Sequence, residues 1–161
     1  MDYKFTWKKD FFNSSFRIFS YDQPQGSFES KFLSGDASAE LFGKKYLFRT
    51  KGFFKPKTTV YDSLNNLKVA EINYRNFNYK ANIKTQTNVY YWKYDNLWNT
   101  KWSLNSNERP IANYKESTTK GQAASITNDP FLILSGLFIG NYYSDMTYFI
   151  IFMVLFIVVI L

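Results

Sequence analysis

The chain has 161 residues and a formal net charge of +7 at pH 7, and 21% of its residues are aromatic. It contains no Cys and no His, which excludes disulfides, thiolate nucleophiles, imidazole bases and metal sites with Cys or His ligands. The length suits one domain, and abundant aromatic side chains favour β-strands. We therefore predict a mainly β protein that is not an enzyme, has no catalytic or metal-binding residues and uses no cofactor.

Alternating apolar and polar residues, interrupted by turn-forming residues, predict about ten short strands before residue 115. The first is residues 3–8, in which Tyr, Phe and Trp alternate with Lys and Thr. Residues 22–26 predict a turn, because Pro fixes φ and Gly permits positive φ. Residues 37–41 are ambiguous between a strand and a helical turn. The clearest alternation lies in residues 77–84.

The most basic stretch runs from residue 44 to residue 57 and contains no acidic residue. Such a stretch is typical of a surface that faces phosphates or lipid headgroups. The alternative is the polar side of an antiparallel sheet, where alternation of this kind is ordinary. The residues that we predict as lipid-binding or anion-binding are Lys44, Lys45, Arg49, Lys51, Lys55 and Lys57.

Two further hairpins are predicted at residues 58–72, with a turn at Asn65 and Asn66, and at residues 102–114. Many short strands ahead of one helix-prone end favour an antiparallel closed barrel or a sandwich. An enzyme of this composition would need paired carboxylates, such as Asp62 and Glu71, but both occupy ordinary hairpin positions.

The chain becomes strongly apolar after Pro130. Asn128 or Asp129 can cap a helix, Pro130 suits its first position, and Gly140 can end it. Ten residues make about 15 Å of helix, too short for the roughly 30 Å of a bilayer. Because residues 131–139 are apolar on all faces, we predict a helix at about residues 130–140, buried in the core of the domain.

A second apolar block, residues 146–161, contains no charged side chain. As a helix it is about 24 Å long, and the addition of residues 142–145 from the polar joint before it brings it to roughly 30 Å. We predict a second hydrophobic helix at residues 144–161 that anchors the chain in a membrane. The alternatives are a helix packed against protein and a buried strand.

The charge distribution predicts the partner and the orientation. All 20 Lys and Arg residues lie at or before Lys120, and only Asp129 and Asp145 carry charged side chains after it. A basic body with an apolar end favours an anionic membrane over nucleic acid, although a basic face can be merely solvated. The N-terminus lacks an apolar core of signal-peptide length. The positive-inside tendency then predicts a single-pass anchor with the domain on the cytoplasmic side.

The hairpin at residues 60–72, the second hairpin at residues 102–114 and the Asp129–Pro130 start of a short apolar helix resemble the tubby C-terminal-like superfamily. That superfamily includes tubby, the phospholipid scramblases and the LURP-one-related proteins. The resemblance implies a closed antiparallel barrel of about 10–12 short strands around a central hydrophobic helix, covering residues 1–143. Its members are linked to phosphoinositide binding and lipid movement, but no headgroup-binding motif is matched here.

Together these features predict a non-catalytic, membrane-tethered β-barrel that binds lipid headgroups or a membrane protein partner. Anionic membrane lipid is the expected partner, and nucleic acid is not favoured. Two alternatives are a soluble barrel that holds a small apolar ligand and a protein with scramblase-like lipid handling.

Overall fold

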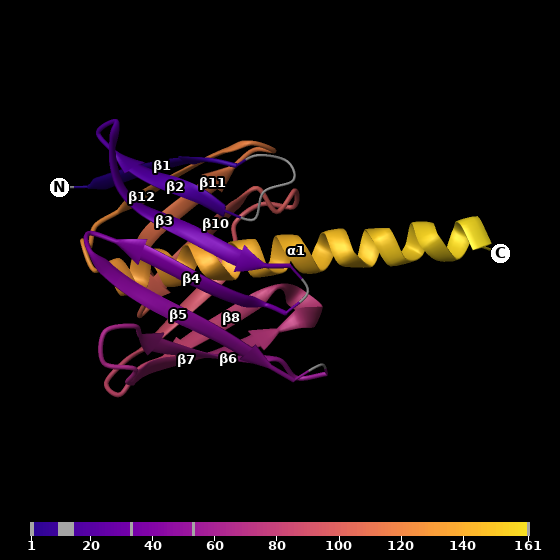
Figure 1. The fold of residues 1–161 in the computed structure, drawn as a ribbon, viewed down its shortest axis with the longest axis horizontal. Helices are drawn as coiled ribbons and strands as arrows, with labels where there is room; N and C mark the ends of the chain where they lie inside the picture. Colours follow the sequence, from indigo (N-terminus) through magenta and orange to yellow (C-terminus); the bar gives the residue numbers. More distant parts are fainter. Residues whose placement is uncertain (1, 10–14, 33, 53, 161) are drawn as a thin grey trace.

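The computed structural model describes residues 2–9, 15–32, 34–52 and 54–160, so Leu161 of the predicted anchor lies outside the described residues. The chain forms a β-barrel with one long helix through its centre (Figure 1). The elements are β1 (Tyr3–Lys8), β2 (Ser15–Ser20), β3 (Gln23–Lys31), β4 (Asp36–Leu41), β5 (Lys44–Lys51), β6 (Lys57–Asp62), β7 (Lys68–Arg75), the 3-10 helix η1 (Asn76–Asn78), β8 (Lys80–Lys84), β9 (Val89–Tyr94), β10 (Lys101–Ser106), β11 (Arg109–Glu116), β12 (Lys120–Ser125) and α1 (Pro130–Ile160).

The barrel is closed by its first and last strands. Every strand pairs antiparallel with its neighbour in sequence, and β1 pairs with β12 from Tyr3 opposite Ser125 to Lys8 opposite Lys120. The predicted closed antiparallel barrel around a hydrophobic helix is therefore confirmed, with twelve strands in the described part of the chain.

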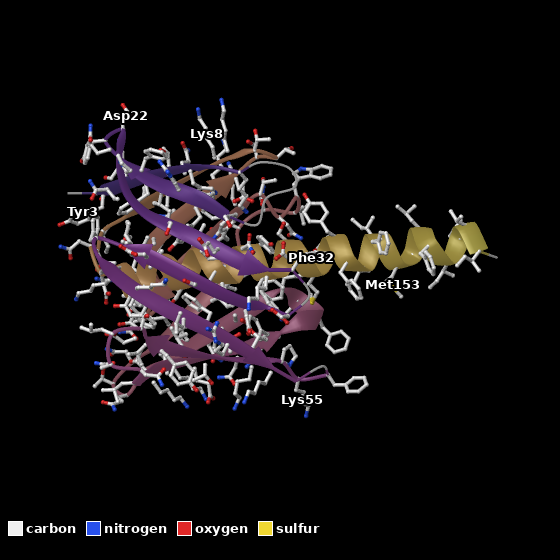
Figure 2. All side chains as sticks on the ribbon, viewed as in Figure 1. Tyr3, Lys8, Asp22, Phe32, Lys55 and Met153 are labelled. Atoms are coloured by element: carbon white, nitrogen blue, oxygen red, sulfur yellow. The ribbon has the colours of Figure 1, made fainter. Side chains whose placement is uncertain are left out.

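The two ends of the barrel differ, because α1 leaves through only one of them (Figure 1). We call this the exit end, and the other the far end. Since the strands alternate in direction, the exit end holds the loops after β1, β3, β5, β7, β9 and β11. Figure 2 places Phe32 and Lys55 towards the side from which Met153 projects, with Tyr3 and Asp22 on the opposite side.

Alternation along the strands builds the core. In β5, for example, Tyr46 and Phe48 are buried while Lys45 and Arg49 are exposed. The inward side chains meet residues 130–140 of α1, all of which are buried. Each large apolar side chain that is buried in this way contributes about 1.5–3 kcal/mol.

Hydrogen bonds to the backbone of α1 also hold the helix in the barrel. The Nε1 atoms of Trp92 and Trp102 both donate to the Gly136 carbonyl, at 3.1 Å each, and the Tyr114 hydroxyl donates to the Ile133 carbonyl at 2.9 Å. Burial raises the pKa of the Tyr114 phenol above its usual range. Because Gly136 has no Cβ, aromatic side chains of the wall can reach the helix backbone.

The structure corrects the division of the apolar end into two helices. α1 begins at Pro130, where the Asp129 carboxylate accepts the N–H of Phe131 at 2.9 Å as predicted, but it continues without a break to Ile160. Gly140 does not end it. A Cβ at Gly140 would lie 2.6 Å from the Trp102 ring, so this glycine allows close packing inside a helix.

The structure resolves one open choice and corrects two smaller expectations. Residues 37–41 belong to β4 and form no helical turn. The turn expected at residues 22–26 lies at Tyr21 and Asp22, which have positive φ, because β3 already starts at Gln23. The start of residues 77–84 is no strand, since η1 and a left-handed residue precede β8.

Gly136→Val is expected to destabilise the barrel, because a side chain there would clash with the Tyr114 ring. This ring stacks on Trp102, with 5.5 Å between the ring centroids. Overpacking of this kind costs about 1–3 kcal/mol, and each kcal/mol lowers Tm by about 2–4 °C. Thermal unfolding in detergent, monitored by near-UV circular dichroism, measures the change in Tm. Ser144→Val, at a partly exposed position of the same helix, is the control. Equal Tm values for both variants would contradict the packing role of Gly136.

Candidate membrane-contact surface

α1 extends far beyond the barrel (Figure 1). Its 31 residues make a helix of about 46 Å. All residues from 150 to 160 are exposed, and none of them is charged. The most apolar 18 residues have a mean hydropathy of 2.2, and only 6% of them are buried in the barrel. By length and composition, α1 is therefore able to cross a membrane.

A collar of polar side chains surrounds α1 where it leaves the barrel. The Lys9 ammonium lies 2.8 Å from the Glu116 carboxylate and donates to the Asn141 amide oxygen at 3.2 Å. The Asn141 amide nitrogen donates to Ser30 at 3.2 Å and to Asp145 at 3.1 Å. We call these five residues the exit collar. They explain the polar joint in the sequence, which marks the mouth of the barrel and not a break in the helix.

Aromatic contacts fix the same part of α1. Tyr142 stacks on Tyr74 with a ring distance of 4.3 Å, and the Tyr143 hydroxyl donates to the Lys80 carbonyl at 2.6 Å. Tyr74 is also hydrogen-bonded to Thr58 at 2.6 Å, and burial raises the pKa of its phenol. The helix is thus held at the mouth by ring packing as well as by the collar.

The structure spreads the predicted basic residues along the barrel wall. All six are exposed: Lys44, Lys45, Arg49, Lys51, Lys55 and Lys57. Lys44 and Lys45 start β5 at the far end and Arg49 lies further along this strand, whereas the other three lie at the exit end, at the end of β5, in the next loop and at the start of β6. The predicted stretch is therefore a line between the two ends, and its role in headgroup binding stays a prediction.

Acidic residues neutralise part of this line. Lys45 stands opposite Glu40 in the sheet, and Lys57 forms a 3.0 Å ion pair with Glu71, which also contacts Lys68 at 3.2 Å. Hydrogen bonds from Lys57 and then Lys68 hold the pKa of the Glu71 carboxyl below its usual value. Exposed pairs of this kind contribute about 0–1 kcal/mol each. Glu71 thus has a structural contact on the outer wall.

The strand register brings together eight lysines, six of which are not among the residues predicted from the sequence. Four pairs stand directly opposite each other on neighbouring strands at the exit end of the described barrel: Lys8 and Lys120, Lys51 and Lys57, Lys80 and Lys93, and Lys101 and Lys115. All eight are exposed, and we call them the exit lysine pairs. Like charges in this arrangement repel and destabilise a sheet. Glu71 and Asp95 lie within 4 Å of Lys57 and Lys93, so the repulsion is partly offset.

One signal for these pairs was present in the sequence. Lys51 and Lys57 flank a single loop, so a hairpin prediction with the correct register would have placed them together. Lys8 and Lys120 could not be found in this way, because they meet only when the first strand closes the barrel against the last.

Two hollows on the outer wall coincide with these lysines. One, of about 640 Å³, includes Lys8, Lys115 and Lys120 in its lining. The other, of about 550 Å³, includes Lys80 and Lys93, together with Arg75 opposite Lys80 and the aromatic residues Tyr91 and Trp92. The lining of both hollows is mainly apolar, and each also includes one acidic residue, Asp22 in the first hollow and Glu108 in the second.

The interior of the barrel is occupied by the chain itself. Residues 130–140 of α1 fill the space where a small apolar ligand would have to lie. In the part of the chain that the structure describes, no group of three or more Asp and Glu residues is arranged to hold a metal ion.

No protein-family model, no curated protein and no solved structure matches this chain. The resemblance to the tubby C-terminal-like superfamily therefore stays a prediction.

Lys51→Glu is expected to raise barrel stability by about 0.2–1 kcal/mol, because it replaces a like-charged pair with an opposite-charged pair across from Lys57. Lys45→Glu, the matched variant on the same strand, is expected to lower stability, because it faces Glu40. Urea unfolding in neutral detergent at low salt measures both. The two effects should shrink at 1 M salt, where the Debye length is about 3 Å. Shifts of the same sign at low salt would show that the like-charge repulsion is absent.

Proposed function

We propose that this protein is a non-catalytic, membrane-tethered β-barrel that binds anionic phospholipid headgroups at its exit end. The observation that carries the proposal is that one rigid helix leaves the barrel as an exposed apolar rod at the same end that carries the exit lysine pairs.

The exposed part of α1 supports the tether. A helix that is apolar on every face has no side suited to water, and in water it would form a large patch prone to aggregation. In lipid the same surface is favourable, and all the backbone polar groups of a helix are satisfied within it. The boundary is sharp, because Asp145 is the last charged side chain before the apolar stretch that begins at Met146.

The exit lysine pairs support anionic phospholipid headgroups as the ligand. Each Lys near an anionic bilayer surface contributes about 1 kcal/mol of attraction, and headgroup phosphates would relieve the repulsion within each pair. Nucleic-acid phosphates could satisfy the same charges, but α1 would hold the lysines beside a membrane.

The orientation follows from the same charges. Lysines and arginines close to a membrane helix favour the cytoplasmic side, and the exit lysine pairs lie beside the start of the exposed part of α1. The barrel is thus proposed to face the cytoplasm. A protein partner in the membrane stays a prediction, and so does scramblase-like lipid handling, which the family resemblance implies.

The full chain is expected to stay in the membrane pellet after alkaline carbonate extraction. A Phe152→Lys, Phe156→Lys variant should be released, because each charge near the middle of a membrane helix costs about 2.5–3.5 kcal/mol. Leu64→Lys, Leu67→Lys adds the same charge to an exposed far-end loop and should be retained. Release of the unchanged chain would remove the basis for the tether.

Headgroup preference is expected to depend on the exit lysines. In vesicles, energy transfer from tryptophan to dansyl-labelled phosphatidylserine should exceed transfer to dansyl-labelled phosphatidylcholine. The excess should fall in a variant with Lys8, Lys51, Lys80 and Lys101 changed to Gln, one from each pair. A variant with the same charge loss at the far end, with Lys44, Lys45, Lys68 and Lys84 changed to Gln, should keep it. An equal fall in both variants would mean that net charge, and not the exit end, determines the preference.

A further inference from the structure

The exit end carries a ring of exposed apolar side chains that the tether does not require. They lie in the loops after β3, β5, β7 and β9, and they are Phe32, Phe54, Phe77, Leu97 and Trp98. Exposure alone does not distinguish this end, because at the far end Leu64 is 94% exposed, close to the 97% of Leu97. Two further observations separate the two ends, and a third shows that some of the exit loops are preorganised.

The first is the absence of a spacer between the barrel and the apolar part of α1. The exit collar holds the helix up to Asp145, and the apolar stretch begins at the next residue, Met146, within the same unbroken helix. One helical turn rises only about 5.4 Å. When Met146 and the residues after it enter the hydrocarbon, the rim of the barrel must therefore lie at the headgroup level of that bilayer.

The second observation is charge. In the described strand register, all four lysine–lysine pairs lie at the exit end. At the far end no lysine faces another lysine in this register, and Lys45 and Lys84 face Glu40 and Glu71. Aromatic side chains at the lipid–water boundary with lysines extending to the headgroups are typical of surfaces that contact an anionic bilayer.

The third observation concerns how the loops are held: internal hydrogen bonds brace two of the exit loops, as they also brace the far-end loop that carries Leu64. The Asn96 side chain accepts the N–H groups of Thr100 and Lys101 at 3.0 Å each, and donates to the Thr100 hydroxyl at 2.8 Å. Leu97 and Trp98 are thereby held at the tip of the loop. The β3–β4 loop is tied to Thr50 in a similar way, through Asp36 and Gly35. A preorganised loop loses little entropy when it inserts.

We propose that the exit loops insert Phe32, Phe54, Phe77, Leu97 and Trp98 into the headgroup–acyl boundary of an anionic phospholipid bilayer, so that the barrel stands on the membrane by its rim. This rests on the proposed function, because α1 must cross that bilayer. It adds that the barrel has one fixed height and tilt, and does not move freely above the surface.

The lack of native cysteine allows single-cysteine labelling with no background. The probes are Leu97→Cys and Phe54→Cys at the exit end, Leu64→Cys as the matched far-end control, and Met153→Cys in α1. The full-length protein is labelled with NBD and reconstituted into vesicles of phosphatidylcholine and phosphatidylserine. Nitroxide-labelled lipid then reports contact with the bilayer. Labels at 97 and 54 are expected to emit at shorter wavelength and to lose most of their emission to the lipid quencher, whereas the label at 64 keeps a water-like spectrum.

The outcomes separate this inference from the tether. If the label at Met153 is not quenched, the tether itself fails and the rim inference fails with it. If Met153 is quenched while both exit labels behave like Leu64, only the rim inference is overturned. If the exit labels are shielded from water but not quenched by lipid, a protein surface covers the rim, and the inference is likewise overturned. Two exit positions keep the test decisive if one variant does not fold.

Discussion

The whole structure depends on α1 filling the barrel. A closed barrel of twelve strands encloses more space than inward side chains from its own wall fill. Here the helix supplies the missing core, and its Gly136 carbonyl accepts the indole N–H groups of Trp92 and Trp102. Without the helix these two donors would be buried without partners, at about 1–3 kcal/mol each, in addition to the lost apolar contacts. The barrel and its apolar helix therefore form one folding unit.

This dependence explains why one helix serves two environments. Inside the barrel, Gly136 and Gly140 let large aromatic rings approach the backbone. Outside it, bulky apolar residues occupy every face. The change occurs at Asn141 and Asp145 of the exit collar, where polar bonds are available from the wall. A continuous helix transmits the position of the barrel to whatever surrounds its exposed half, because it has no hinge at which the two parts could turn independently.

The sequence was sufficient for features that depend on local patterns. Alternation identified most strands, and the capping Asp129 located the start of the helix. It failed where tertiary contacts override local signals. Glycine is common at helix ends, but Gly140 lies inside the helix, where the nearby Trp102 ring leaves no room for a side chain. Phe77 continues an alternating pattern, yet lies in η1 with an exposed side chain.

The candidate surface was harder to predict than the fold for the same reason. The stretch from Lys44 to Lys57 is conspicuous because its charges are adjacent in sequence, but adjacency along a strand runs from one end of a barrel to the other. A surface at one end collects residues from every second loop instead. Lys8 and Lys120 meet only through barrel closure, and no local pattern carries that information.

The exit end carries two features that are unfavourable for a barrel in water. Opposed lysines such as Lys51 and Lys57 repel, and tips such as Phe54 and Trp98 expose apolar surface. Both become favourable at the surface of an anionic bilayer, where phosphates screen the lysines and the boundary region accepts the rings. At the far end of the described barrel no lysine stands opposite another lysine, and Lys45 faces Glu40. The two ends of the barrel thus differ in their lysine–lysine pairs, and these pairs lie at the end through which α1 leaves.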